Sequence, residues 1–360
     1  MAENTSLHSA KRAKNDEFYT QYSDIESEMN AYIEFDPDVF RDKTVLLPCD
    51  DPEWSNFTKY FASNFTRFGL KRLISTSYAK SAGSKQLTLF EQESPLYDEE
   101  KHETRGKLFT LTRDKNGSGG IDTDDIEFYG YLDGDGDFRS AEVRALRDEA
   151  DIIVTNPPFS LFREFIAWLM EADKKFLVIG SQNAITYKEF FPLLKNDDVW
   201  LGLTHPKEFV QLGGEVKKFG NICWFTNIDH VKRHEPLLLD TMEHNLKFNK
   251  KLRKKLEKDF GAVEYPHYDN YDAIEISFTD AIPSDYAGVM GVPITFLDKY
   301  NPDQFEIIWQ ASGNTRVCAP EAVLADLHYV KCDEDRGGCG LVNGARVYSR
   351  ILIRNKHPEK

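Results

Sequence analysis

The sequence predicts an α/β fold whose core is an open, doubly wound, Rossmann-like parallel sheet. Short apolar runs rich in β-branched residues alternate with segments in which apolar residues recur at helical spacing. One such run, at residues 151–154, leads through a short polar turn directly into a helical pattern. A length of 360 residues with 41% apolar side chains suffices for two packed domains, or for one large domain with an appendage.

The apolar pattern places helices and strands in chain order. Helices are predicted at residues 25–32 and 54–61. The apolar stripe over residues 161–170 predicts a third helix, with Ser160 as its N-cap. The predicted buried strands lie at residues 43–52, where the strand ends in acids, and at residues 70–78, 151–154, 176–180, 199–203 and 221–227.

Residues 80–130 interrupt this alternation and are predicted to be an insertion. They are rich in Ser, Gly, Asp and Glu, with alternating runs at residues 108–111 and 126–129 that predict a β-hairpin. After residue 261 the pattern is irregular. Strand-like pieces occur there at residues 273–278, 288–297, 305–309 and 346–354.

Composition argues against several classes of protein. No apolar run approaches the roughly 20 residues that span a bilayer, and the amino terminus is too polar for a signal peptide. The five cysteines show no paired Cys-x-x-Cys spacing, which disfavours a zinc site and fits a reducing compartment. A cytoplasmic protein is therefore expected. The net charge of −15 leaves nucleic-acid binding open, because that binding depends on local basic patches.

The turn Asn156-Pro157-Pro158-Phe159 carries the most chemical information in the sequence. It follows a predicted strand, at the edge where open α/β sheets place their sites. An amide oxygen and a backbone carbonyl can each accept one N–H bond from an amino group on an aromatic ring, which returns the lone pair to the nitrogen. Phe159 offers a ring on which a base can stack. The alternative is a simple loop before a helix.

An acidic turn at residues 133–137 resembles the start of a calcium loop. Phe138 stands where such a loop needs glycine, and Arg144 stands where it needs a bidentate Glu. A calcium site is therefore disfavoured.

Two further stretches connect the sequence to a known family. Residues 16–20 are Asp-Glu-Phe-Tyr-Thr, and residues 49–52 are Cys-Asp-Asp-Pro, followed by Ser-Asn-Phe at residues 55–57. Together with Asn-Pro-Pro-Phe, these stretches resemble the EcoRI-type family of adenine-specific DNA methyltransferases. The resemblance covers nearly the whole chain from about Lys14 onward.

The resemblance implies S-adenosylmethionine as the cofactor. In the family, an aromatic residue near the amino terminus covers the cofactor, Thr holds its carboxylate, and an Asp-Phe motif meets its adenine. The strand at 70–78 lacks the acid that usually holds the ribose, so Asp50 or Asp51 is expected to replace it. For residues 16–20 the alternative interpretation is a plain helix start. For Asp137 and Phe138 the alternative is an acidic turn in solvent. The implied cofactor residues are Glu17, Phe18, Tyr19, Thr20, Cys49, Asp50, Asp51, Asp137 and Phe138.

Local basic segments are the candidate contacts to DNA. Residues 247–258 hold seven basic residues against one acid. Phe248, Leu252 and Leu256 are spaced four apart, which predicts one amphipathic helix with a cationic face. A merely solvated helix face is the alternative. The candidate DNA contacts are Lys217, Lys218, Lys232, Arg233, Lys251, Arg253 and Lys254.

The sequence thus predicts a DNA adenine-N6 methyltransferase that uses no metal. A disordered lead-in at residues 1–14 is expected to precede a catalytic domain at 15–227 and a target-recognition region at 228–360. The predicted catalytic residues are Asn156, Pro157, Pro158 and Phe159.

The expected partner is double-stranded DNA, bound by a monomer, with or without a separate cognate restriction endonuclease. Two alternatives remain open. The same turn serves RNA-base or protein-amide N-methyltransferases, and a related protein could bind DNA or cofactor without turnover.

Overall fold

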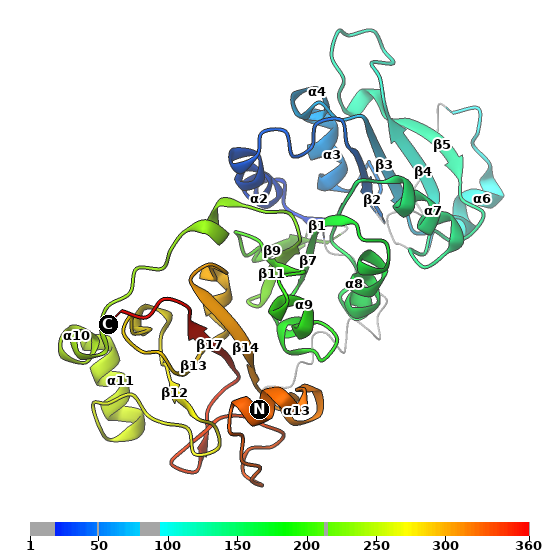
Figure 1. Ribbon diagram of the computed structural model, residues 1–360. Coiled ribbons are helices and arrows are strands. Elements are labelled where there is room, and N and C mark those ends of the chain that lie inside the picture. The colour runs from blue at the N-terminus through cyan, green and yellow to red at the C-terminus, as the bar shows by residue number, and fades with distance from the viewer. Residues whose placement is uncertain (1–18, 49, 80–93, 212–214, 360) are drawn as a thin grey trace. The chain divides into compact units, whose positions relative to one another are not determined.

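The computed structural model describes residues 19–48, 50–79, 94–211 and 215–359, which form two compact units (Figure 1). Unit 1 comprises Met1–Gln182 and Leu201–His230, and unit 2 comprises Asn183–Trp200 and Val231–Lys360. The assignment of residues 228–360 to target recognition stays a prediction, because the packing units do not report what a segment recognises.

Unit 1 is built on an eight-stranded mixed sheet with the strand order β5-β4-β3-β2-β6-β7-β11-β8. The central strands β3, β2, β6 and β7 are parallel to one another. The predicted parallel sheet is correct only for this centre, because β4, β5 and β11 run antiparallel to their neighbours. The hairpin predicted in the insertion is confirmed as β4 and β5, which extend the sheet beyond β3. The strands are β2 (Thr44–Leu47), β3 (Arg72–Ser77), β4 (Lys107–Leu111), β5 (Glu127–Tyr131), β6 (Ile152–Thr155), β7 (Lys175–Ser181), β8 (Trp200–Leu201) and β11 (Ile222–Thr226).

Helices cover both faces of this sheet, as its alternating side chains require. On one face, Val45 of β2 and Val154 of β6 share a buried cluster with Ile25 and Phe57 of two helices. On the other face, a Cβ at Gly180 of β7 would lie 2.4 Å from the ring of Phe162, so glycine lets a helix approach closely. The helices of unit 1 are α2 (Tyr22–Phe35), α3 (Asn56–Ser63), α4 (Phe65–Phe68), α6 (Glu99–Thr104), α7 (Ala141–Glu149) and α8 (Phe162–Glu171), with 3₁₀ turns η2 (Thr123–Asp125), η3 (Phe159–Leu161) and η4 (Gln182–Thr186), the last of which runs into unit 2.

The start of α8 differs from the prediction. Ser160 is not its N-cap, because the turn η3 lies between β6 and the helix and Leu161 takes the capping position without a side-chain bond. Among the described helices of both units, none is both long and apolar enough to cross a membrane.

A separate three-stranded antiparallel sheet in unit 1 joins the start of the described chain to a later basic segment. Its order is β1-β9-β10, formed by Tyr19–Thr20, Glu208–Val210 and Val216–Lys218. Thr20 is the partner of Phe209 in this sheet. Two stretches that the sequence separates by almost 190 residues, Tyr19–Thr20 and Glu208–Val210, are therefore neighbours.

Unit 2 centres on a four-stranded sheet in the order β12-β13-β17-β14. The strand-like pieces predicted in this half correspond to β12 (Ala273–Glu275), β13 (Val289–Pro293), β14 (Phe305–Ala311) and β17 (Arg350–Asn355). Phe191 packs edge-on against Trp309 of β14, with ring centroids 5.3 Å apart. The remaining elements are α9 (Phe191–Lys195), η5 (Val231–His234), α10 (Met242–Phe248), α11 (Lys250–Phe260), η6 (Thr279–Ala281), η7 (Ile294–Lys299), α12 (Thr315–Cys318), α13 (Glu321–Asp326), β15 (Leu341–Val342) and β16 (Ala345–Arg346).

Candidate active site

The carboxyl ends of β2 and β6 meet where the sheet reverses its strand order. The chain passes from β2 to β3 on one side and later enters β6 on the other side of β2, and open α/β sheets form a crevice at such a point. The hydroxyl of Thr155, which ends β6, lies 2.9 Å from the carbonyl oxygen of Pro48 and 2.7 Å from Oδ2 of Asp50. The predicted catalytic turn therefore begins directly after a side chain anchored to the predicted cofactor turn.

Asp50 is the centre of this junction, and further hydroxyl groups hold it. Ser55 donates to Oδ1 of Asp50 at 2.7 Å. Thr58 of α3 donates to the backbone carbonyl of Asp50 at 3.1 Å, and Ser75 of β3 donates to the same oxygen. Together with Thr155, these bonds tie the end of β2 to β3, β6 and α3. The turn is thus fixed by bonds from three other elements in addition to the bond from Ser55.

Burial raises the pKa of the Asp50 carboxyl to about 7, against the opposing effect of the bonds from Ser55 and Thr155. The neighbouring Asp51 adds a smaller upward contribution to this pKa. The geometry agrees with a protonated Asp50, because the single hydroxyl proton of Thr155 cannot serve both of its acceptors. When Asp50 carries a proton, Asp50 can donate to Thr155 while Thr155 donates to Pro48, and every group is then paired.

The predicted catalytic turn, residues 156–159, directly follows Thr155 in this network. Asn156 and Phe159 are half-buried, whereas Pro157 is buried. The amide of Leu161 donates to the carbonyl of Pro158 at 2.9 Å and closes the 3₁₀ turn η3. Two consecutive prolines remove two N–H donors and fix two φ angles, so this turn is conformationally restricted and rich in acceptors.

Phe159 is held by an aromatic chain from the three-stranded sheet. Its ring is edge-on to Phe219, with centroids 6.4 Å apart, and Phe219 is edge-on to Phe209 at 5.6 Å. Since Phe209 is paired with Thr20 across β1 and β9, the predicted catalytic turn and the predicted amino-terminal cofactor segment are linked through one sheet. The sequence did not reveal this link, because its members lie far apart along the chain.

A polar cofactor needs groups that the protein itself leaves unmatched. Thr20 is 2% exposed, and its hydroxyl has no hydrogen-bond partner among the described residues. Asn56 donates from Nδ2 to the carbonyl of Thr20 at 2.8 Å, which fixes β1 beside the start of α3. In the same region of the described chain, buried Oε2 of Glu53 and Nε1 of Trp54 are also without partners. Unmatched donors and acceptors at one strand end fit a nucleoside-like cofactor. Neither Glu53 nor Trp54 was predicted as a cofactor residue from the sequence, although both directly follow the Cys-Asp-Asp-Pro motif.

The remaining cofactor residues predicted near the amino terminus and after β2 differ in their surroundings. Glu17, Phe18 and Cys49 lie outside the described residues. Tyr19 is paired with Val210 in the three-stranded sheet. Asp51 is buried, and its Oδ1 accepts from the amide of Glu53 at 3.0 Å.

The acidic turn at residues 133–137 packs directly against the end of β3. Gly136 has φ of +84°, and a Cβ there would lie 2.3 Å from the carbonyl oxygen of Ser77. Only glycine permits this backbone approach. The turn is thereby placed at the strand end that lacks its own acid.

Asp137 and Phe138 are both engaged within unit 1. The Asp137 carboxylate pairs with Arg139 at 2.7 Å. Phe138 is 2% exposed and packs edge-on against Phe165 and Trp168. The structure thus gives Phe138 a role in the core, and its predicted stacking on the cofactor's adenine stays a prediction.

The basic residues predicted to contact DNA have different environments. Lys217 and Lys218 are exposed on β10, and Lys218 forms an ion pair with Glu208 at 2.6 Å. In unit 2, the Arg233 side chain is only 11% exposed, pairs with Asp197 at 3.2 Å and lies 3.6 Å above the Trp200 ring. This arrangement supports a structural role for Arg233 and does not support the predicted phosphate contact.

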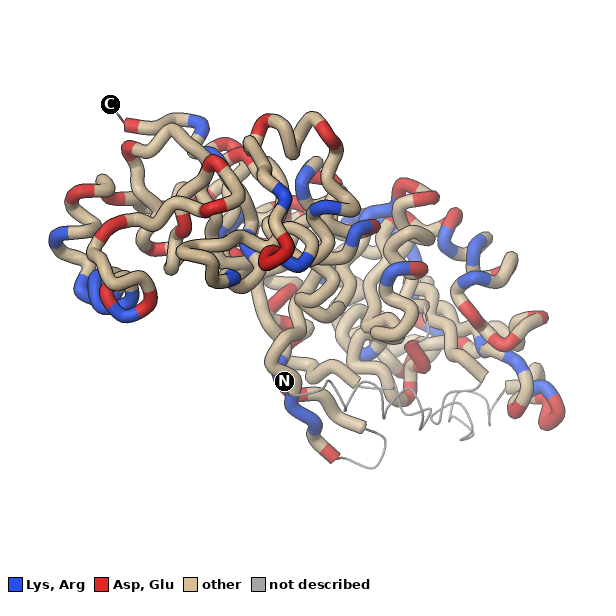
Figure 2. Tube along the Cα trace, turned by 90° about the horizontal axis from the view of Figure 1, so that it is seen from below, with Lys and Arg blue, Asp and Glu red and all other residues tan. Residues whose placement is uncertain are grey.

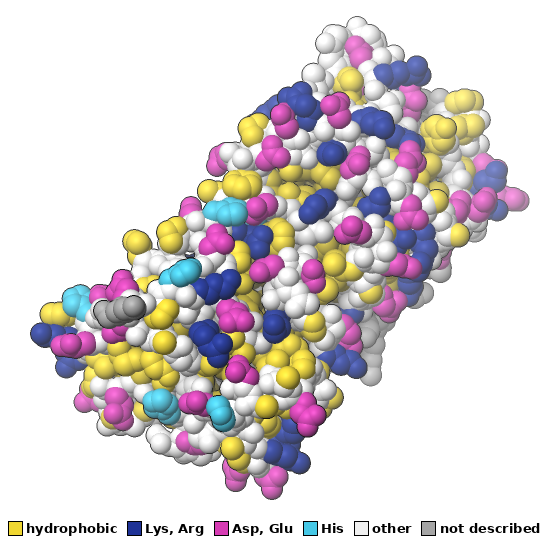
Figure 3. Space-filling view, in the orientation of Figure 1, with side chains coloured by type: hydrophobic (Ala, Val, Ile, Leu, Met, Phe, Trp, Pro, Cys, Tyr) yellow, Lys and Arg dark blue, Asp and Glu magenta, His cyan; other side chains and the backbone are white. Residues whose placement is uncertain are grey.

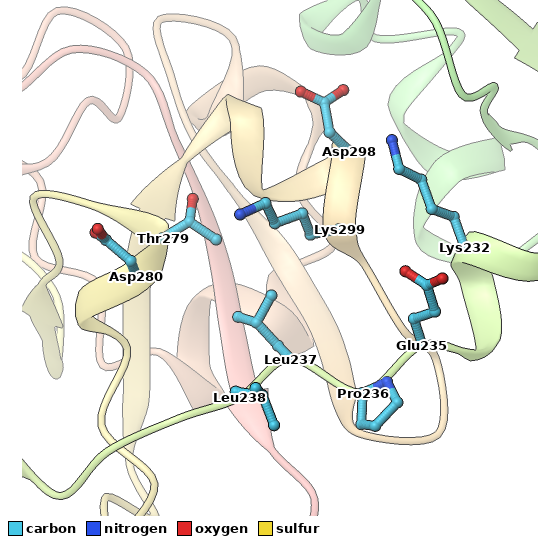
Figure 4. Close-up of a pocket in the computed structure, with 9 residues that line it drawn as sticks. All are labelled: Lys232, Glu235, Pro236, Leu237, Leu238, Thr279, Asp280, Asp298 and Lys299. Atoms are coloured by element: carbon cyan, nitrogen blue, oxygen red, sulfur yellow. The ribbon is translucent and has the colours of Figure 1, made fainter.

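Lys232 lines a pocket of about 330 Å³ in unit 2 (Figure 4). Its amine points toward Asp298, and Glu235 and Lys299 also line the pocket. Two lysines beside several carboxylates do not make a strongly cationic surface. The lining residues are Lys232, Glu235, Pro236, Leu237, Leu238, Thr279, Asp280, Asp298 and Lys299.

The predicted single helix over residues 247–258 is wrong. The structure has two helices, α10 and α11, with Asn249 as the residue between them; Oδ1 of Asn249 accepts from the amide of Leu252 at 3.0 Å. Leu252 and Leu256 are buried as predicted, whereas Phe248 is 57% exposed. Asn is a strong N-cap, and this capping bond starts a new helix at residue 250.

The cationic face of α11 is confirmed as a surface feature. Lys and Arg gather along α11 (Figure 2), whereas basic and acidic side chains are mixed over the face of the molecule in Figure 3. Lys251 lies 3.8 Å above the ring of Phe278, and Arg253 donates to the carbonyl of Lys247 at 3.4 Å. Lys254 is exposed. The described residues contain no group of three or more His, Cys, Asp or Glu that could hold a metal ion.

The amino-acid sequence is similar to those of one family of known proteins. The family described as "Adenine-specific methyltransferase EcoRI" matches residues 6–356. The chain is 40% identical to the Type II methyltransferase M.EcoRI of Escherichia coli, over all of this chain and 99% of that protein. It is 34% identical to the Type II methyltransferase M.MpnI of Mycoplasma pneumoniae, over 96% of this chain and 97% of that protein. A third relative, the Type II methyltransferase M.MgeORF184P of Mycoplasma genitalium, is 33% identical over 96% of this chain and 98% of that protein. No solved structure shows significant similarity.

Proposed function

The chain belongs to the EcoRI-type family of adenine-specific methyltransferases, and from this we propose how its two units methylate adenine N6 in a short specific DNA site. The junction of β2 and β6 supports the proposal most directly, because Thr155 connects the cofactor turn at Asp50 to the catalytic turn at Asn156. Unit 1 is then a Rossmann-like methyltransferase domain with its crevice at the strand-order reversal.

Asn156 and Pro157 act on the adenine amino group. The exocyclic nitrogen is a poor nucleophile while its lone pair is delocalised into the ring. The Asn156 amide oxygen and the Pro157 carbonyl each accept one N–H bond, which draws the nitrogen toward tetrahedral geometry. Pro158 fixes the turn. The catalytic contribution of these residues is positioning and a shift of electron density, without a covalent intermediate.

Phe159 stacks on the target adenine after the base leaves the duplex. Extrusion costs a few kcal/mol of unstacking and unpairing, which an aromatic surface partly offsets. Phe219, edge-on to Phe159, keeps that ring in orientation. A half-buried ring has one side supported by the protein and some surface left for a ligand, as stacking requires.

S-adenosylmethionine is the proposed cofactor, and when bound it supplies an already activated methyl group on its sulfonium. The unmatched hydroxyl of buried Thr20 fits the cofactor's carboxylate. Tyr19 and Asp51 lie on the segments that border the same crevice. Asp50, whose carboxylate is bonded on both oxygens, fixes the turn that carries Asp51. The other proposed cofactor residues are Glu17, Phe18, Cys49, Asp137 and Phe138.

DNA is proposed to contact exposed lysines through its phosphates. Lys217 and Lys218 border the β10 strand beside the aromatic chain, and Lys251, Arg253 and Lys254 belong to the cationic α11. The region at 228–360 is proposed to recognise the target. A monomer can methylate each strand in turn. The names of the Type II relatives support modification in the context of restriction, with a separate endonuclease as the proposed companion.

The test is transfer of tritiated methyl from S-adenosylmethionine to unmethylated genomic DNA, with RNA and a protein extract in parallel. We expect label in N6-methyladenine of the DNA only, and sequencing of the product then gives the site. Label in RNA or protein alone would retain the Asn156 chemistry and overturn the DNA assignment. Cofactor binding without transfer to any substrate would support a non-catalytic binding protein.

A further inference from the structure

The proposed cofactor site requires an acceptor for the ribose hydroxyls. In nucleoside-binding α/β folds, an acid near the end of the strand beside the first strand takes this role. Here the end of β3 is Thr76-Ser77, followed by Tyr78 and Ala79, with no acid. Another element must therefore provide the carboxylate.

Asp50 is a poor candidate for this role. Its Oδ1 accepts from Ser55 and its Oδ2 is paired with Thr155, both at 2.7 Å. Burial also raises the pKa of Asp50 to about 7. A carboxyl that is already bonded within the protein and easily protonated is a weak acceptor for two further hydroxyls.

Glu53 differs from Asp50 in its hydrogen bonding. Its Oε2 is buried and has no hydrogen-bond partner among the described residues. An unpaired buried carboxylate oxygen is destabilising, because it has lost its water without gaining a donor. A ligand that brings hydroxyl donors removes that cost. The indole Nε1 of the adjacent Trp54 is likewise buried and unpartnered, but as a donor.

The backbone holds Glu53 and Trp54 in a defined turn at the strand-order reversal. The carbonyl of Asp51 accepts from the amides of Trp54 at 3.1 Å and Ser55 at 2.7 Å. Oδ1 of Asp51 accepts from the amide of Glu53 at 3.0 Å. Both side chains therefore project from a fixed loop between β2 and α3.

The buried hydroxyl of Thr20 is an independent observation that supports the same site. Thr20 is 2% exposed, its hydroxyl is unpartnered, and Asn56, two residues after Trp54, donates to its carbonyl. One acceptor, one donor and one hydroxyl thus remain unmatched on two segments joined by a hydrogen bond. A ribose with two hydroxyls, attached to a carboxylate-bearing chain, offers the complementary groups.

We propose that Glu53 is the residue that accepts the ribose hydroxyls of the cofactor, with Trp54 donating from Nε1 to a cofactor oxygen in the same pocket. This assignment rests on the proposed function and specifies its cofactor site. It assigns the ribose to Glu53 in place of Asp50, whose two carboxyl oxygens are already bonded within the protein.

The first experiment measures binding by titration calorimetry on the full chain, with S-adenosylhomocysteine and with 5′-methylthioadenosine. The second ligand keeps the ribose and lacks the amino-acid part. Glu53→Gln and Glu53→Ala are expected to weaken both ligands by about 10- to 100-fold, the range for a lost bond to a charged group. The matched control is Glu26→Gln, since Glu26 is exposed on α2, and it is expected to bind as the wild type does.

A deoxyribose analogue separates a ribose contact from a general effect on folding. Wild type is expected to bind 2′,3′-dideoxy-methylthioadenosine much more weakly than methylthioadenosine, whereas Glu53→Ala binds the two with similar affinity. Weakened S-adenosylhomocysteine with unchanged methylthioadenosine would place Glu53 at the ammonium group and overturn the assignment. Unchanged affinity for both ligands would also overturn it while leaving the proposed function intact. Absence of binding by the wild type would instead contradict the proposed cofactor.

Trp54 gives a second measurement that does not depend on affinity. The chain has five tryptophans, and S-adenosylhomocysteine is expected to change the intrinsic fluorescence of the wild type. Trp54→Phe is expected to remove most of that change while the protein stays folded. A full fluorescence change in Trp54→Phe would place the cofactor away from this turn.

Discussion

The junction of β2 with β6 and the basic helix α11 hold their proposed functional groups in opposite ways. At the junction, each polar group is fixed by a bond to a different element, as Thr155 is to Asp50. On α11, the positive charges are exposed along one helix, and Lys254 reaches into solvent. The first region depends on the position of single atoms. The second depends on the number of charges, so its members can replace one another.

This contrast predicts different responses to mutation. Removing one group from a preorganised site loses an interaction that nothing else can supply. Removing one lysine from a cationic face lowers the local charge by one unit and leaves the remainder in place.

Asn156→Ala is expected to reduce methyl transfer by about 1,000-fold, because a preorganised hydrogen-bonding group in an enclosed site is worth about that much. Cofactor affinity is expected to stay close to that of the wild type, because the Thr20 and Asp50 segments are unchanged. Single-turnover transfer and calorimetric titration of S-adenosylhomocysteine measure the two quantities separately. Full transfer by the variant would remove Asn156 from the mechanism.

Combined substitution of Lys250, Lys254 and Lys258 by Gln is expected to weaken DNA binding without slowing transfer at saturating DNA. Each lost phosphate contact lowers the slope of log K against log salt by about 0.9. Each single variant is expected to show about a third of the combined change. The matched control is Lys255→Gln, since Lys255 is already paired with Asp259 at 2.5 Å. A salt slope that does not change in the triple variant would leave α11 as a merely solvated face.

The two regions also differ in how far the sequence predicts them. The run Ile152–Thr155 and the turn after it were predicted correctly as a strand and its end, because β-branched residues and prolines act locally. Ser160 was wrongly assigned as a cap, since the short turn η3 depends on how the prolines direct the chain. The unpartnered groups of Glu53 and Trp54 were not predictable. Whether a polar atom finds a partner is decided by residues distant in the sequence.

On α11 the sequence predicted the charge and missed the helix boundary. The spacing of Phe248 with Leu252 and Leu256 suggested one continuous stripe. The polar Asn249 between them carried the signal for a break, since Asn is favoured at an N-cap. The positive charge can be counted in the sequence. Whether the apolar stripe continues through residue 248 or a new helix starts after Asn249 depends on packing, and in the structure Phe248 is exposed.

Asp50 makes the junction sensitive to pH. Its pKa in the folded protein, about 7, exceeds the ordinary aspartate value of 3.8, so between these two pH values the folded protein binds a proton that the unfolded chain does not. The contribution of this bound proton to the free energy of unfolding is complete below about pH 4 and is lost as the pH rises to about 7. Asp50→Asn, a neutral isostere, is expected to flatten the fall in urea midpoint between pH 5 and pH 7. Buried Glu28 and Glu275 have pKa values shifted in the same direction, so some slope is expected to remain. An unchanged slope in the variant would show that Asp50 is ionised in the folded state.

Asn249→Ala is expected to have the smallest effect, because it changes only the stability of α11. The Asn249 side chain accepts from the amide of Leu252 at 3.0 Å, and loss of such a cap costs about 1 kcal/mol. Faster amide exchange is therefore expected over α11, with unchanged exchange in β2 and β6 and unchanged transfer at saturating DNA. Asn249→Ser keeps a capping oxygen and is expected to protect α11 nearly as well as the wild type does. Equal loss of protection in both variants would mean that the cap does not define the boundary. The cationic helix would then owe its start to the burial of Leu252 and Leu256, and its charges would be positioned by the core of unit 2 rather than by local sequence.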